Sequence, residues 1–299
     1  MRISIKKIIF LLLFHLELQL GLCYINSTST KELFIDKEKV VNSTFFALLE
    51  YRLSTCIISK NFSTMLTSIF CYLFMEKKFK LKYNHLADFN WKFSKCIRQI
   101  KYKSLRELIN DLNYHNDNEF SKNWILLLIV RNPIERFISG YVDKCTQRIR
   151  LKKRTKMCLY CVSNIECFIN RLYKKINSSI KIKRATYNGV KKHFFPQIMQ
   201  CDYYKHKNKF KILKYDRKNL NNFYSEFEDI LASRNISKNH IKFMDKELKN
   251  FRVHHATSNK TKTNEFTLRL YKNKRLINKL INIYNRDFKE FNFPYPEVV

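Results

Sequence analysis

The sequence predicts an α/β fold with a mainly parallel sheet flanked by helices and with a cysteine-rich insertion. One observation is the continuous apolar run at 124–130, WILLLIV, which is typical of a parallel strand covered on both faces. Another is that this run and the β-prone segment at 51–58 are each followed by a helix-like segment. Repeated strand–helix pairs are typical of parallel sheets.

Composition is consistent with a folded chain that binds anions. The 299 residues are 45% apolar and 15% aromatic, which supports one large domain or two small ones and excludes disorder. The 58 Lys and Arg against 25 Asp and Glu give a net charge of +33, which attracts nucleic acids, acidic membranes or acidic polysaccharides. AT-biased codons would produce the same Lys, Asn and Ile excess, so the charge alone does not choose among them.

The N-terminus predicts entry into the secretory pathway. A basic start precedes an apolar run at 8–14, which is too short to span a bilayer comfortably, so residues 1–23 read as a signal peptide in preference to a signal anchor in the membrane. We expect a lumenal stem at 24–50 and the folded domain at 51–299. The expected location is the Golgi lumen or membrane, with secretion if the leader is cleaved.

Cysteine usage fits that oxidising compartment. Eight cysteines follow Cys23, an even number that is expected to form disulfides, although about 105 connectivities are possible. The CLYCVSNIEC cluster, with a further cysteine before it, also resembles a zinc pattern, but no second Cys-x-x-Cys pair supports a zinc ribbon or finger. The eight are Cys56, Cys71, Cys96, Cys145, Cys158, Cys161, Cys167 and Cys201.

Local signals place the expected elements. Ser63 is suited to cap a helix at 63–74, and Asn132, Pro133 and Glu135 have the spacing of a capping box at the start of the helix that follows 124–130. The remaining expectations are an amphipathic segment at 104–112, a basic cysteine-rich insertion at 145–167, a helix at 164–176, an irregular aromatic loop at 193–204, a strand at 210–215, helical structure at 217–250 and one long helix at 264–291.

The loop at 59–64, SKNFST, follows the first of these strands, at the end of the sheet where α/β proteins bind ligands. Lys60 supplies a cation, and Ser63 and Thr64 supply hydroxyl groups at a helix N-terminus, which together form a small phosphate-binding site. The loop has no glycine and is not a Walker A sequence. Asn61 begins one of six glycosylation triplets, and a glycan there would block this site.

The loop at 131–139, RNPIERFIS, follows the 124–130 strand. Arg131 can hold a phosphate with its planar fork, and Ser139, two turns into the helix, can add a hydroxyl group on the face that also carries Arg136 and Asp143. The alternative is that Arg131 only pairs with a carboxylate. Two anion-suited loops at two strand ends favour a ligand.

These residues resemble a known family. Arg-Asn-Pro, Glu-Arg-Phe, Ser-Gly-Tyr and Asp-Lys within 131–144 are similar to the 3'-phosphate-binding motif of Golgi carbohydrate sulfotransferases, and 59–64 stands where their 5'-phosphosulfate loop would. The likeness is to the chondroitin 4-O-sulfotransferase type, in a divergent, cysteine-rich, nematode-type branch. Further similar stretches are 158–168, 193–201 and 231–297. The resemblance implies a P-loop-like sulfotransferase domain at 51–299.

The resemblance also implies a reaction and its residues. The donor would be 3'-phosphoadenosine-5'-phosphosulfate, and the acceptor an anionic, chondroitin-like glycan carrying N-acetylgalactosamine; no metal is required. Lys60, with Ser63 and Thr64, would bind the 5'-phosphosulfate and stabilise the leaving phosphate, while Arg131 and Ser139 would bind the 3'-phosphate.

We expect His193 to be the catalytic base, because it precedes an aromatic loop suited to a sugar and imidazole titrates near neutral pH. His206, His254 and His255 compete for this role.

Two other functions stay open. The family's 5' loop usually has a proline before the lysine and often a glycine after it, whereas this chain has Ser59 and Asn61, so an inactive relative that only binds glycans is the alternative. Nucleic-acid binding would use the positive charge, but the sequence shows no recognition helix, zinc finger or RNA motif, and a leader argues against access.

Overall fold

The computed structural model describes residues 41, 43–91, 95–114, 116–146, 156–177, 188–253 and 261–297. The predicted leader, most of the predicted stem, the basic part of the insertion at 147–155 and the competing histidines His254 and His255 lie outside the described residues. Within the described ranges, no helix is both long enough and apolar enough to cross a membrane.

The sheet has five strands in the order β3-β1-β2-β4-β5. Strands β2 (Leu53–Cys56), β4 (Ile125–Arg131) and β5 (Phe210–Tyr215) are parallel, which confirms the predicted α/β class. Strands β1 (Phe45–Leu48) and β3 (Lys101–Tyr102) continue the sheet in antiparallel pairings. Strand β1 belongs to the sheet, although it precedes the domain start expected at residue 51.

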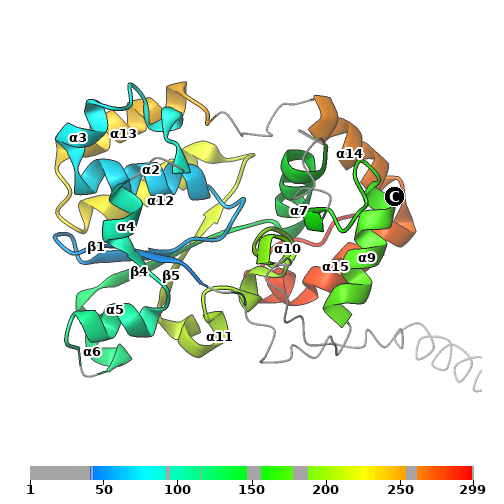
Figure 1. The fold of residues 1–299 in the computed structure, drawn as a ribbon, viewed down its shortest axis with the longest axis horizontal. Coiled ribbons are helices and arrows are strands. Elements are labelled where there is room, and N and C mark those ends of the chain that lie inside the picture. Colours follow the sequence, from blue (N-terminus) through cyan, green and yellow to red (C-terminus); the bar gives the residue numbers. More distant parts are fainter. Residues whose placement is uncertain are drawn as a thin grey trace, which may run out of the picture. The chain divides into compact units, whose positions relative to one another are not determined.

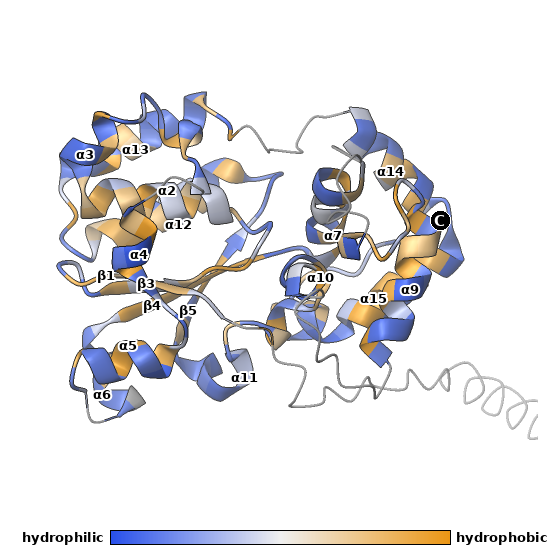
Figure 2. Ribbon diagram, viewed as in Figure 1, coloured by the Kyte–Doolittle hydropathy of each residue, from blue (hydrophilic) through white to orange (hydrophobic). Residues whose placement is uncertain are grey.

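Helices surround this sheet (Figure 1). The apolar core joins β1, β2, β4 and β5 to α2, α12 and α13, which lie together on one side of the sheet in Figure 1. Figure 2 shows apolar residues along the central strands and polar residues on the outer helix surfaces. The longer helices are α2 (Ser63–Phe74), α7 (Pro133–Tyr141), α9 (Ile165–Asn177), α12 (Leu220–Ala232), α13 (Lys238–Asn250), α14 (Thr261–Tyr271) and α15 (Lys274–Glu290).

Shorter helices complete the fold: α3 (Glu76–Lys80), α4 (Cys96–Ile100), α5 (Leu105–Asp111), α6 (Asp117–Asn123), α10 (Asn188–Phe194) and α11 (Tyr203–His206). Helices α10, α14 and α15 pack against α7, and α9 packs against α15, beyond the carboxyl end of β4 (Figure 1). The carboxyl ends of the parallel strands therefore face α7 and the helices packed with it.

The start of α7 confirms most of the capping prediction. The Asn132 side-chain oxygen accepts hydrogen bonds from the N–H groups of Ile134 (3.0 Å) and Glu135 (3.2 Å), and Pro133 is the first helical residue. The reciprocal half of the predicted capping box is replaced, because the Glu135 carboxylate accepts from the Arg131 side chain.

Two predicted elements were wrong in detail. The segment at 264–291 is two helices, because Asn273 caps α15 by accepting a hydrogen bond from the Leu276 N–H (3.1 Å). The segment at 193–204 is not an irregular loop but contains the end of α10, a 3-10 turn at Gln197–Met199 and α11. Phe194 and Phe195 are fully buried there, so they are core residues and not a platform for a sugar.

The eight cysteines after Cys23 form four disulfides. This confirms the disulfide prediction, and the zinc alternative is wrong because all four sulfurs that it required are bonded in pairs. The pairs are Cys56–Cys201, Cys71–Cys96, Cys145–Cys158 and Cys161–Cys167.

The pairs enclose very different lengths of chain, which predicts different effects of their removal. Cys56–Cys201 spans 145 residues and Cys161–Cys167 spans 6. Because a cross-link restricts the unfolded chain more when the loop is longer, replacing the first pair with serine should lower the free energy of unfolding by about 5 kcal/mol and the second by about 2 kcal/mol. Urea unfolding of the two double variants measures both, and equal losses would contradict this account.

Candidate functional site

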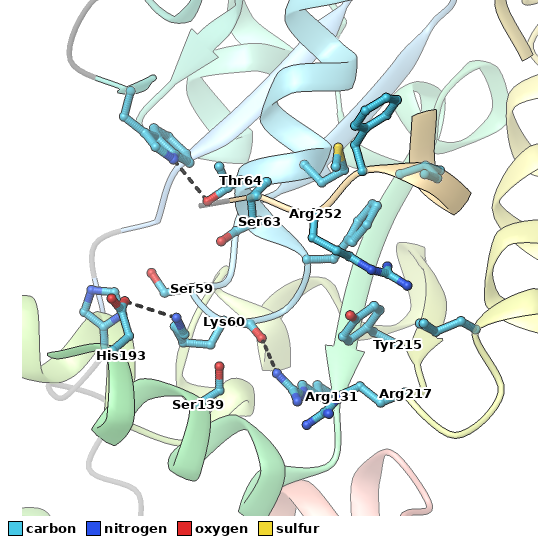
Figure 3. Close-up of a pocket in the computed structure, with 18 of the residues that line it drawn as sticks. Ser59, Lys60, Ser63, Thr64, Arg131, Ser139, His193, Tyr215, Arg217 and Arg252 are labelled. Atoms are coloured by element: carbon cyan, nitrogen blue, oxygen red, sulfur yellow. Dashed lines mark hydrogen bonds and ion pairs between the residues drawn. The ribbon is translucent and has the colours of Figure 1, made fainter. Parts of the chain in front are cut away.

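A cavity of about 460 Å³ lies at the carboxyl ends of the parallel strands (Figure 3). Each of the three strands is followed by residues that line it: the loop after β2, the β4–α7 junction and the segment after β5. All six site residues predicted from the sequence line this one cavity. They are Lys60, Ser63, Thr64, Arg131, Ser139 and His193.

Lys60 is fixed in the cavity by an acidic partner. Its Nζ lies 3.1 Å from Asp143 Oδ2, and both side chains are nearly buried. Burial lowers the pKa of Lys60 to about 8, although Asp143 acts in the opposite direction. Burial would raise the pKa of Asp143, but Lys60 and Lys144 outweigh it and hold that pKa below its ordinary value. Lys60 therefore stays charged at neutral pH while having little water around it.

The backbone of the 59–64 loop takes the shape that a glycine would normally supply. Lys60 (φ 74°) and Phe62 (φ 63°) both lie in the left-handed region, which costs on the order of 1 kcal/mol for each non-glycine residue. Packing of the half-buried Phe62 ring against Phe223 (5.1 Å between centroids) and Tyr215 (5.7 Å) offsets this cost.

The N-terminus of α2 is left without a side-chain cap. The prediction that Ser63 caps this helix was wrong, because Phe62 occupies the cap position and Ser63 is the first helical residue. The N–H groups of a first helical turn have no partner within the helix. Here they adjoin the cavity that Ser63, Thr64 and Met65 line, in an arrangement that suits an anion.

Asn61 is only 2% exposed, and its Nδ2 donates a hydrogen bond to the Ile129 carbonyl (3.0 Å). The folded domain has no room for a glycan on this side chain. The triplet at Asn61 is thus no obstacle to an open site.

Arg131 both pairs with a carboxylate and lines the cavity. It donates from Nη2 (3.1 Å) and Nε (3.3 Å) to Glu135 Oε2, and from Nη1 to the Lys60 carbonyl (3.2 Å). Its guanidinium carbon lies 5.4 Å from the centre of the Tyr215 ring. These bonds use three of the five guanidinium N–H groups, which leaves two for a ligand. They also tie the two loops to each other.

The fully buried side chain of Gln197 connects the same loops. Its Oε1 accepts from the Arg131 N–H (3.0 Å) and from Asn61 Nδ2 (2.5 Å), and its Nε2 donates to the Arg131 carbonyl (2.8 Å). Asp287 of α15 accepts from the N–H groups of Gln197 (2.8 Å) and Ile198 (3.1 Å). Burial raises the pKa of Asp287 to about 6. Sequence reasoning missed both residues, because their partners are 66 to 136 positions away.

Arg136 has a structural role. Although it shares the α7 face predicted from helical spacing, it is fully buried, and it donates to the carbonyls of Phe195 (2.9 Å), Lys192 (3.0 Å) and Ser59 (3.1 Å). This side chain joins α7, α10 and the 59–64 loop, with no part of it in the cavity lining.

His193 lies at the same end of the cavity as Lys60, and Ser139 lies between Lys60 and Arg131 in the view of Figure 3. Its Nδ1 atom is buried and has no hydrogen-bond partner in the part of the chain that the structure describes. Burial lowers the pKa of His193 well below its ordinary value, so the ring is neutral at physiological pH. Among its competitors, His206 is buried and does not line this cavity.

At the other end of the cavity, Arg131 alone was predicted. Arg131, Tyr215 and Arg217 lie together there, and Arg252 lies across from them, donating from Nη1 to the Tyr224 hydroxyl (2.9 Å) (Figure 3). Arg217 follows β5 and Arg252 follows α13, and these positions were the available signal. The cavity thus has a polar end at Lys60 and an aromatic, basic end at Tyr215.

Comparison with known proteins shows which family the chain belongs to. Three proteins of Caenorhabditis elegans are similar: "Uncharacterized protein C18B2.2" is 29% identical over 250 residues (83% of this chain, 68% of the relative), and "Putative sulfotransferase vep-2" is 31% identical over 211 residues (70% and 64%). "Carbohydrate sulfotransferase chst-1" is 25% identical over 250 residues (82% and 73%). No solved structure matches. Residues 43–294 match the Sulfotransferase family, and the chain belongs to that family.

Proposed function

We propose that this protein transfers a sulfuryl group from 3'-phosphoadenosine-5'-phosphosulfate to a hydroxyl group of a glycosaminoglycan sugar. The acceptor sugar that we propose is N-acetylgalactosamine of chondroitin. The observation that carries the proposal is the convergence of Lys60, Arg131 and His193 in one cavity at the ends of parallel strands. Family membership implies the donor in general. The similarity to a protein named carbohydrate sulfotransferase supports a sugar as the acceptor.

The cavity suits the donor in size and in the order of its groups. A volume of about 460 Å³ is within the usual range for small-molecule sites. The 5'-phosphosulfate would lie on the uncapped N-terminus of α2 beside Lys60, Ser63 and Thr64. Arg131 and Ser139 would hold the 3'-phosphate. The aromatic residues beyond Arg131 would cover the nucleoside.

Transfer in this geometry is an in-line displacement at sulfur. A bond forms from the sugar oxygen to sulfur while the bond from sulfur to the 5'-phosphate oxygen breaks, so that negative charge grows on the leaving phosphate. Lys60 stabilises that charge, and it does so strongly because it is nearly buried. His193 accepts the proton of the sugar hydroxyl, since its ring is neutral and the residue lines the cavity beside Lys60.

The alternative is a relative that binds glycans without transferring sulfate. It rests on Ser59 and Asn61, which replace the proline and glycine of the usual 5' loop. The loop nevertheless reaches left-handed backbone at Lys60 and Phe62 and keeps Lys60 in the cavity, which favours an active enzyme. Four disulfides and family membership suggest the secretory pathway, and we propose the Golgi lumen as the location.

Replacement of Lys60 should abolish most transfer. In Lys60→Ala, loss of one preorganised charge at the leaving group is expected to lower kcat by about 10²- to 10³-fold. The measurement is transfer of radiolabelled sulfate to desulfated chondroitin, with circular dichroism to verify folding. Lys205→Ala, which removes an exposed lysine of α11, is the matched control and should retain full activity. Undiminished transfer by folded Lys60→Ala would contradict the proposed role.

Nucleotide binding should weaken at alkaline pH because of Lys60. Its pKa of about 8 means that its positive charge is lost as pH rises through that value, so the affinity for 3'-phosphoadenosine-5'-phosphate should fall there. Lys60→Arg keeps its charge and should show no decrease in the same interval. Calorimetric titration across this range measures the difference. Parallel curves for the two proteins would assign the pH dependence to another group.

A further inference from the structure

A second cavity, of about 210 Å³, adjoins the larger one. Ser59 and Trp91 line both, so the two spaces meet at these side chains. Lys192, Gln200 and Thr44 supply further polar groups to the smaller cavity. None of the predicted site residues lines it.

The smaller cavity adjoins the reacting end of the larger one. Ser59 directly precedes Lys60, and Lys192 directly precedes His193, so each of the two proposed catalytic residues has its chain neighbour in the second cavity. The residues proposed for the 3'-phosphate and nucleoside do not line it. In an in-line transfer the acceptor must approach sulfur on the side away from the leaving phosphate. A space beside Lys60 and His193, separate from the nucleotide, meets that requirement.

Trp91 gives this junction a fixed aromatic surface. The indole is 40% exposed, its Nε1 donates to Thr64 Oγ1 (3.3 Å), and its ring lies 6.0 Å from Phe89 and 6.3 Å from Phe46. An indole pairs a flat apolar face with a polar edge, and this one stands where the two cavities meet. The C–H face of a sugar ring is a matching surface.

Lys192 gives the cavity an uncompensated cation. Its carbonyl is held by Arg136 Nη2 (3.0 Å), which fixes the backbone, while no ion pair joins its ammonium group to a carboxylate of the described ranges. Lys192 is an exposed residue, so its ammonium group can reach a ligand in the cavity. Desolvation, and then the charge of Lys101, lower the pKa of Lys192. A lysine on a cavity wall without an acidic partner in the described ranges attracts an anion.

We propose that this smaller cavity is the acceptor site and that it takes an anionic, hexuronate-containing oligosaccharide. Trp91 stacks on the sugar that receives the sulfuryl group, and Lys192 pairs with the carboxylate of the adjoining hexuronate. The assignment of this site as the acceptor site rests on the proposed function, whereas sugar binding at Trp91 and Lys192 is measurable without any transfer.

The chain's two tryptophans make a direct test possible. Trp124 is 6% exposed, so Trp91 is the one that a ligand can reach. Titration of the full chain with a non-sulfated chondroitin hexasaccharide should change the tryptophan fluorescence, and Trp91→Phe should remove the change. Lys192→Ala should weaken binding about tenfold, as expected for loss of one charge pair in a binding site. The control variant Lys205→Ala should bind the hexasaccharide with the affinity of the wild type. A hexasaccharide whose carboxyl groups have been reduced should bind the wild type about tenfold more weakly, which is the loss expected for the intact hexasaccharide with Lys192→Ala.

Equal affinity of the wild type and Lys192→Ala, or an unchanged fluorescence response in Trp91→Phe, would overturn the site. Binding of 3'-phosphoadenosine-5'-phosphate by the same proteins separates this outcome from failure of the proposed function. If the protein binds the nucleotide, and if its affinity for the sugar is unchanged in the Trp91 and Lys192 variants, only the acceptor site is contradicted. Sugar binding that depends on both residues, in a folded protein that does not bind the nucleotide, supports the site and contradicts sulfuryl transfer.

Discussion

The Gln197 side chain joins the 59–64 loop to the β4–α7 junction, the two segments proposed to bind the phosphates of the donor. Each loop leaves a different strand of the sheet, so their cations share one ligand only if the spacing is fixed. Gln197 bonds to both backbone groups of Arg131 and to Asn61, and Asp287 anchors it to α15. Each unmet buried hydrogen bond costs about 1–3 kcal/mol. A change at Gln197 would therefore loosen both loops at once, although it touches no proposed ligand.

Charge in the site is controlled locally, against a background of +33. Glu135 and Asp143 each hold one of the two principal cations in place, Arg131 and Lys60 respectively. Burial shifts the balance further, since it lowers the pKa of Lys60 to about 8 and keeps His193 neutral. The same end of the cavity thus contains a charged group suited to a leaving phosphate and a neutral group suited to accept a proton.

Local sequence signals predicted the parts of the fold that local chemistry determines. Lys60 and Arg131 were predictable because both directly follow apolar strands, and parallel strands end at one edge of a sheet. The α7 start was predictable from Asn132. Gln197 and Asp287 were not, because their hydrogen bonds join segments far apart in sequence. The break between α14 and α15 was missed because the apolar pattern continues across it.

The central claim is that one cavity binds a nucleotide carrying a 3'-phosphate and a 5'-phosphate. The most direct measurement is isothermal titration of the folded protein with 3'-phosphoadenosine-5'-phosphate, beside Arg131→Ala and a control, Arg275→Ala, on the surface of α15. The account predicts one-to-one micromolar binding by the wild type and the control and its loss in Arg131→Ala. Absence of binding by folded wild type, or equal binding by Arg131→Ala, would contradict it.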